Sequence, residues 1–132
     1  MTPEGAALAR HRMSRAREAL RDADLLAAQQ SAAGAVNRYY YAAFHAARAL
    51  LATIDLDAAR HSGVIALFQR HFVKTGLFST DIARVLPRSF EKRLNSDYGD
   101  FAQVTAEEVD QIGQGVHRFV EECQRVLGSP QT

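Results

Sequence analysis

The clearest hydrophobic pattern of the chain lies between residues 35 and 54. Apolar side chains recur there at steps of three and four residues, as on one face of a helix, at Val36, Tyr40, Ala43, Ala47, Leu50 and Ile54. A second face carries mostly alanine, whose small side chain lets another backbone approach closely. Because a helix with two packing faces must be covered on both, this segment is predicted to be the central helix of a bundle.

The polar residues of the same segment form one narrow stripe. They are Arg38, Tyr41, His45 and Arg48, at steps of three, four and three residues. Arg38 and His45 are two helical turns apart, so their side chains point the same way. A charged and a titratable side chain on a central helix need water or a polar partner. The stripe is therefore predicted either to line a cleft or to meet a partner.

Helical patterns also cover the residues on either side of the central helix. The first helix is predicted to start at Pro3, which suits a first helical turn, and its period holds to about residue 27. A loop is expected at residues 55–60. The third helix should follow with Ser62 as its N-cap and should stop at Gly76.

The sequence of the last third of the chain predicts further helices. Ser79 can cap a helix, and Pro87 should divide it into two pieces, because proline breaks or kinks a helix. Thr105 and Glu108 form a capping box that begins a final helix, which ends near Gly128. The sequence thus predicts an all-α, antiparallel up-and-down bundle of about five helices in a single domain, residues 1–132. Its predicted core contains Val36, Tyr40, Ala43, Ala47, Phe68, Phe72, Leu86, Phe90, Ile112, Val116 and Phe119.

Composition narrows the classes of function. Hydrophobic residues make up 47% of the chain and the formal net charge is +1, but basic residues are concentrated at 10–21 and 84–93. Such patches permit phosphate binding without demanding it. A single cysteine excludes a disulfide framework, and the histidines show no metal-ligand spacing, so no metal or cofactor is expected. Without an apolar run of membrane-spanning length or a signal peptide pattern, the chain is expected in the cytoplasm, away from membranes.

Three motifs in order resemble one family. They are NRYYYAAFHAARALL at 37–51, HSGVIALF at 61–68 and FEKRLNSDYGDF at 90–101, followed by the capped final helix. Together they are similar to the HEPN domain family, in its single-domain bacterial and archaeal branch, over roughly residues 10–127. The resemblance implies a helical bundle that is usually a homodimer. It also implies a gene pair with a minimal nucleotidyltransferase, as in toxin–antitoxin systems.

The resemblance further implies chemistry on RNA. Many HEPN members are metal-independent endoribonucleases whose site is an Arg and a His with four to six residues between them. Arg38 and His45, with six residues between them, are one place for this pair. The other place begins at Arg93, where a tyrosine, Tyr98, stands at the expected histidine position. Histidine has an ordinary pKa near 6.5 and suits a general base, whereas tyrosine near 10 does not.

We therefore expect Arg38 and His45 as the catalytic residues if the chain cleaves RNA. Residues expected to bind RNA or a nucleotide are Tyr41, His61, Arg93, Asp97 and Tyr98. The polar stripe of the central helix is predicted to face Arg93, Asp97 and Tyr98, with Arg38 paired to Asp97. In the purely structural alternative, these polar groups hold the two helices together, and His61 shapes its loop.

Two functions from different classes remain open at this point. One is an RNase-type toxin that acts through a cleft lined by Arg38, His45 and Arg93. The other is a non-catalytic module that docks or regulates a nucleotidyltransferase, or that binds a nucleotide.

Overall fold

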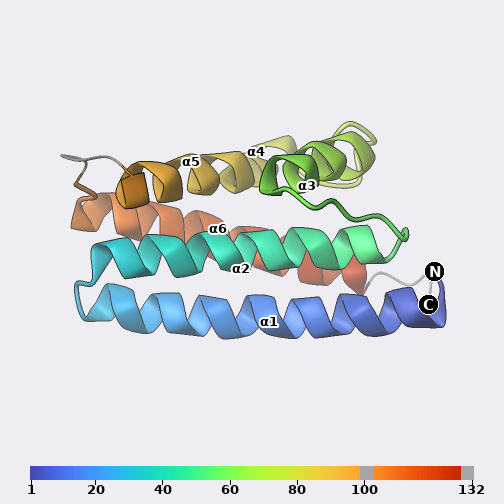
Figure 1. Ribbon diagram of the computed structural model, residues 1–132, viewed down its shortest axis with the longest axis horizontal. Helices are drawn as coiled ribbons and strands as arrows, with labels where there is room; N and C mark the ends of the chain where they lie inside the picture. Colours follow the sequence, from blue (N-terminus) through green and yellow to red (C-terminus); the bar gives the residue numbers. More distant parts are fainter. Residues whose placement is uncertain (99–102, 129–132) are drawn as a thin grey trace.

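The structure of the protein, a computed structural model, is an all-α bundle described over residues 1–98 and 103–128. No strand occurs within these two ranges. Its helices are α1 (Pro3–Ala28), α2 (Ala32–Ala52), α3 (His61–Phe68) with a π-helical turn (Gln69–Val73), α4 (Thr80–Ala83), α5 (Val85–Tyr98) and α6 (Ala106–Leu127) (Figure 1). The predicted fold class is confirmed.

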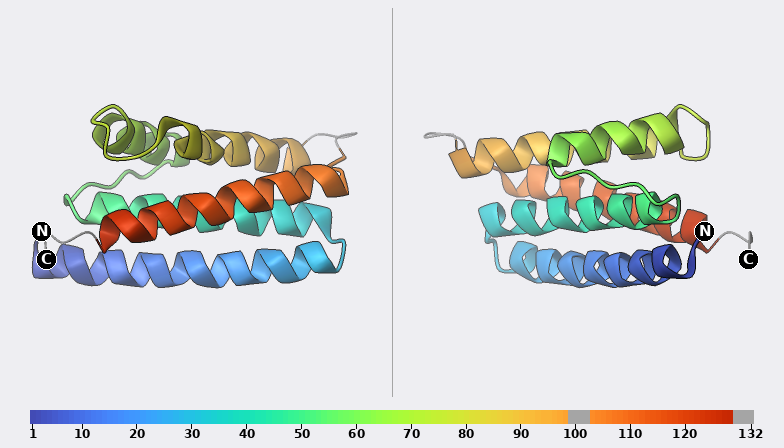
Figure 2. Two further views of the ribbon diagram at one scale, coloured as in Figure 1. Left: turned by 180° about the vertical axis from the view of Figure 1, so that it is seen from behind. Right: turned by 45° about the vertical axis from the view of Figure 1, so that its right-hand side comes forward.

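The helices pack with α2 at the centre. α2 and α6 form the middle of the bundle, α1 covers them on one side, and α3, α4 and α5 cover them on the other (Figures 1 and 2). Thirteen of the 21 residues of α2 are buried, so this helix has little free surface apart from its polar stripe. The central position predicted from its two apolar faces is confirmed.

The core forms where the periodicity placed it. Nine of the eleven predicted core residues are buried, and the other two, Phe90 and Ile112, are half-buried against the same cluster. The apolar pattern of α2 was extended too far at its end, since Ile54 is 42% exposed. The helix ends at Ala52, and Ile54 lies beyond its last turn.

Helix starts were predicted with mixed success. The capping box is confirmed, because the Thr105 hydroxyl accepts from the Glu108 amide and the Glu108 carboxylate accepts from the Thr105 amide. Ser79 also caps α4 by accepting from the Ile82 amide. Ser62 does not cap α3, because the extended backbone at Arg60 begins that helix two residues earlier.

Two breaks in the helices have clear backbone causes. Gly76 adopts a φ of +80°, which only glycine reaches without strain, and it ends the segment that begins with α3. The helix containing Pro87 is divided as predicted, but the break falls at Arg84. Pro87 itself lies in the first turn of α5, where the missing N–H has no helical acceptor to lose.

Candidate functional site

The polar stripe of α2 meets α5 at Tyr41. The Arg38 guanidinium lies 5.1 Å from the centre of the Tyr41 ring, and the Arg93 guanidinium lies 5.4 Å from the same ring. Tyr41 is therefore contacted by one arginine from each helix, at the distance at which a cation is attracted to an aromatic ring. The predicted meeting of the stripe with Arg93 is confirmed.

The expected partner of Arg38 is different. Its Nε and Nη2 donate to the Asn37 side-chain oxygen at 3.1 and 3.0 Å, and Asp97 lies beside Arg93 instead, with 3.5 Å between the Arg93 Nε and a carboxylate oxygen. The Arg38–Asp97 pair was therefore predicted wrongly. The Arg93 Nε is buried and makes no hydrogen bond to a described residue, so Asp97 holds it by charge alone. The Tyr98 side chain lies outside the described residues.

His45 lies where arginines of two helices converge. It is half-buried between α1 and α2, and its pKa is lowered to about 4, first by burial and then by Arg15, Arg48, Arg38 and Arg12. The imidazole is consequently neutral at pH 7. A bound anion would offset the positive charge around His45 and raise its pKa again.

His61, the first residue of α3, lies at the same place. Its ring stacks on Phe44 at 4.2 Å, and its Nδ1 lies 2.7 Å from the Tyr40 hydroxyl. Burial, followed by Arg93 and Arg48, lowers its pKa. The Tyr41 ring lies between the two histidines, 5.9 Å from His45 and 5.8 Å from His61. The structure thus brings together Arg38, Tyr41, His45, His61, Arg93 and Asp97.

Two arginines of the site are fixed by one aspartate that the sequence did not reveal. Asp57, in the loop after α2, accepts from Arg12 at 3.0 Å and from Arg48 at 3.1 and 2.7 Å. Arg12 is only 8% exposed and also donates to the Arg48 carbonyl at 3.1 Å. These contacts lower the pKa of Asp57 to about 2. Arg12, Arg15 and Asp57 show no motif, because they meet only when α1 packs on α2.

We call this group the basic cluster. It consists of Arg12, Arg15, Arg38, His45, Arg48, His61 and Arg93, around Tyr41. Asp57 and Asp97 are the carboxylates that contact its arginines among the described residues. Five arginines against two aspartates leave a net positive charge, which suits phosphate groups.

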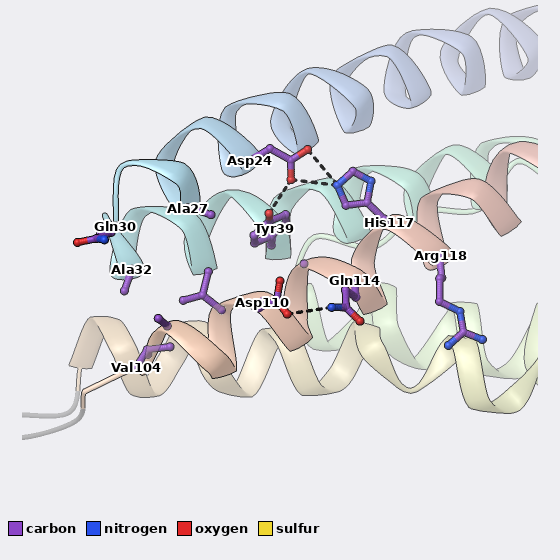
Figure 3. A pocket seen from close by; sticks show the side chains of 13 residues that line it. Asp24, Ala27, Gln30, Ala32, Tyr39, Val104, Asp110, Gln114, His117 and Arg118 are labelled. Atoms are coloured by element: carbon purple, nitrogen blue, oxygen red, sulfur yellow. Dashed lines mark hydrogen bonds and ion pairs between the residues drawn. The ribbon is translucent and has the colours of Figure 1, made fainter.

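A cavity on another face of α2 is lined by side chains of both charges. It measures about 950 Å³ and lies between α1, α2 and α6 (Figure 3). There Asp24 accepts a 2.6 Å hydrogen bond from the Tyr39 hydroxyl and contacts the His117 Nε2 at 2.9 Å. Asp110 lines the same cavity. Asp24 and Asp110 stand against one arginine, Arg118, in this lining, whereas the basic cluster has five arginines against two aspartates. The basic cluster is therefore the better candidate for binding RNA or nucleotide.

Comparison with known proteins agrees with this fold and with these motifs. The family model of the HEPN domain matches residues 9–126. The chain belongs to the HEPN domain family. A UPF0332 protein of Thermotoga maritima is 38% identical over 113 residues, 86% of each chain. A Methanocaldococcus jannaschii protein named "Putative toxin MJ0605" is 37% identical over 93 residues, 70% of this chain and 69% of that one.

In this HEPN domain the two places for the Arg–His motif lie next to each other. Arg38 and His45 lie on α2 and Arg93 lies on α5, and both arginines contact the Tyr41 ring. Sequence spacing alone presented the two places as alternatives, although helix packing brings them together. Within residues 1–98 and 103–128, no group of three or more His, Cys, Asp or Glu side chains could hold a metal ion. None of the helices in these ranges has the length and apolar character of a membrane span.

Proposed function

We propose that this HEPN protein is a toxin that binds RNA at the basic cluster and cleaves it without a metal ion. The observation that carries the proposal is that Arg38 and Arg93 both lie over the Tyr41 ring, with the His45 ring 5.9 Å from it. Arginine binds phosphate oxygens through paired N–H groups and stays charged at every physiological pH. A neutral imidazole beside such a phosphate can accept a proton.

The chemistry requires only RNA, these residues and water. His45 takes the proton of a ribose 2′-hydroxyl while the 2′ oxygen attacks the adjacent phosphorus. The P–O5′ bond then breaks, the 5′ oxygen takes a proton from water, and His45 returns its proton to the hydroxide that is left. The products are a 2′,3′-cyclic phosphate and a 5′-hydroxyl. Arg38 and Arg93 stabilise the charge that builds up on the phosphorus oxygens.

Binding of RNA also prepares the base in this mechanism. In the free protein burial, followed by the charges of four arginines, lowers the pKa of His45 to about 4, which makes it a weak base. A phosphate among these arginines offsets the part of the lowering that they cause, while the larger part, from burial, remains. The pKa of His45 therefore rises in part when RNA binds, and proton transfer is favoured by that amount.

The comparisons and the family resemblance support this role. Two relatives from Methanocaldococcus jannaschii carry the word toxin in their names. By analogy with paired HEPN systems, we propose a homodimer that acts in the cytoplasm and is controlled by a nucleotidyltransferase partner.

A non-catalytic binding module is the second candidate. It is favoured by Tyr98, a tyrosine at the motif position where active members have histidine. In that case the basic cluster would bind RNA or a nucleotide, and the nucleotidyltransferase partner would be docked or regulated.

Cleavage of a labelled single-stranded RNA in EDTA tests the proposal. We expect cleavage by the wild type and a loss of about 100-fold or more in His45→Ala, because general-base catalysis contributes that much. Arg38→Ala and Arg93→Ala should weaken both binding and cleavage. Arg125→Ala is the matched control, because Arg125 is also paired with an acid but lies on α6, outside the cluster.

The possible results separate the candidates. RNA binding that depends on Arg38 but is not followed by cleavage would favour the binding module. Wild-type protein that neither binds nor cleaves RNA would overturn the proposal.

A further inference from the structure

A smaller cavity adjoins the basic cluster where α2, the loop after it and α3 meet. It measures about 500 Å³ and is lined by Phe44, Arg48, Asp57, Ala58, Ala59 and His61. Its charged and polar side chains come from Arg48, Asp57 and His61. The chemistry of the cavity therefore depends on which hydrogen-bonding groups of these three residues remain free.

The hydrogen bond between Tyr40 and His61 determines which ring nitrogen of His61 carries the proton. The Tyr40 side chain is fully buried, so its hydroxyl proton needs an acceptor inside the protein. The His61 Nδ1, at 2.7 Å, is its hydrogen-bond partner. When Nδ1 accepts, the proton of the neutral imidazole sits on Nε2. His61 then offers an N–H donor on the ring edge away from Tyr40.

Arg48 is fixed by Asp57, and its Nη1 group bonds to no described residue. Asp57 accepts from its Nε and Nη2, and no described residue hydrogen-bonds to its Nη1. The Asp57 charge is shared with Arg12, so two guanidinium groups face one carboxylate. The cavity wall consequently keeps a net positive charge despite its aspartate.

Gly63 allows the loop after α2 to pack closely against the start of α3. A Cβ atom on Gly63 would lie 2.9 Å from the Ala58 Cβ, closer than two such atoms normally approach. Glycine at this position thus lets the loop residues 57–59 pack directly on the start of α3. The loop holds Asp57 beside Arg48, while α3 holds His61.

We propose that this cavity is a second phosphate subsite, where the Arg48 guanidinium and the His61 Nε2–H bind oxygens of the phosphate next to the scissile one. The subsite rests on the proposed function for its ligand, an RNA strand. In it His61 is a neutral hydrogen-bond donor rather than a base, and Tyr40 is the positioning residue that sets its tautomer. His45 remains the general base and acts at the scissile phosphate, which is the neighbouring phosphate of the same RNA strand.

The tautomer and the binding can be measured together by NMR on the full chain labelled with ¹⁵N. At pH 7 the free protein should show a protonated His61 Nε2 and an unprotonated Nδ1. The probes are inorganic phosphate and a UpU dinucleotide that carries 2′-O-methyl riboses and a 3′-phosphate, called UpU below. It offers one phosphate to the basic cluster and a neighbouring one to the subsite, and its blocked 2′ oxygens prevent cleavage. Both should shift the His61 Nε2–H signal, and UpU should bind more tightly because it also reaches the basic cluster.

Two variants and a matched control complete the test. Arg48→Ala should weaken UpU binding about tenfold or more, as expected for loss of a charge-assisted hydrogen bond. Tyr40→Phe should mix the His61 tautomers and weaken UpU binding. Tyr39→Phe loses a comparable hydroxyl hydrogen bond, to Asp24 on another face of α2, and should bind UpU like the wild type.

The results distinguish this inference from the proposed function. A proton on His61 Nδ1 in the free protein, or a His61 signal unmoved by saturating UpU, would overturn the subsite even if RNA is cleaved at His45. Shifts at His61 that disappear in Arg48→Ala would support the subsite even if no RNA is cleaved.

Discussion

Arg12 of α1 and Asp57 of the loop after α2 form a salt bridge of 3.0 Å, although 45 residues separate them in the sequence. The same carboxylate binds Arg48 at 2.7 Å. One loop residue therefore fixes two arginines of the basic cluster against each other. Without it, the two like charges would repel across the contact between α1 and α2.

Asp57→Asn should destabilise the fold in a pH-dependent way. The folded-state pKa of Asp57 is about 2, below its unfolded value, so the unfolded chain binds more protons as the pH falls. The stabilisation is present above about pH 4 and is lost as the pH falls toward 2. Because the side chain is 44% exposed, we expect only about 1 kcal/mol at pH 7. Urea unfolding of both proteins at pH 7 and pH 3 measures the difference, and equal stability at pH 7 would contradict the prediction.

Gly113→Ala should be strongly destabilising. An added Cβ would lie 2.9 Å from the Tyr39 hydroxyl, and the buried Tyr39 ring cannot yield while its hydroxyl is bound to Asp24. We expect a loss of about 1–3 kcal/mol, typical of overpacking, in thermal or urea unfolding. Gly34→Ala is the control, since its neighbours are side-chain atoms at 3.2 Å or more and alanine favours a helix. That variant should be neutral or stabilised.

His45 should make stability depend on pH near neutrality. Its folded-state pKa of about 4 lies below the ordinary 6.5, so the unfolded chain binds more protons between these values. The free energy of unfolding should therefore decrease as the pH falls from about 6.5 to 4. His45→Gln should remove about 2 kcal/mol of that decrease, discounted for partial exposure. Parallel pH slopes of the wild type and His45→Gln would show that His45 is not responsible.

Arginines of the basic cluster should determine how RNA binding depends on salt. Each phosphate contact releases bound counterions, so losing one contact lowers the slope of log affinity against log salt by about 0.7 on a single strand. Arg38→Ala and Arg93→Ala should each lower the slope by about that amount in fluorescence anisotropy. Arg125→Ala should leave it unchanged. Equal slopes for all four proteins would place the phosphate contacts elsewhere.

The proposed homodimer is tested by mass. Static light scattering at micromolar concentration should give twice the 14.6 kDa of one chain. A mass of one chain under these conditions would exclude a stable dimer.

Periodicity was sufficient for the fold and for part of the site. Alternating steps of three and four residues placed Val36 and Tyr40 in the core, and they left Arg38, Tyr41 and His45 on one stripe. Those positions are fixed by the geometry of a single helix, so they can be derived without knowing its neighbours.

Contacts between distant segments could not be derived in this way. The pairs Arg12–Asp57, Tyr40–His61 and Asp24–His117 each join two elements, and no spacing rule relates their members. The Arg38–Asp97 prediction failed for a related reason. A stripe shows which way a side chain points, but the neighbour it bonds to depends on helix rotation and rotamer, and Asp97 instead lies one turn from Arg93 on its own helix.

The alanines that fill the buried faces of α2 also bear on how this protein can diversify. Ala42, Ala43, Ala46, Ala47, Ala49 and Ala52 are all buried, and any larger side chain there would push neighbouring helices apart. In a saturation mutagenesis experiment these positions should therefore tolerate almost nothing larger than alanine or serine. Arg38, Tyr41 and His45 lie on another face of the same helix, where they are only partly buried. Evolution could therefore substitute the polar residues of the stripe one at a time while the packing of the helices stays unchanged.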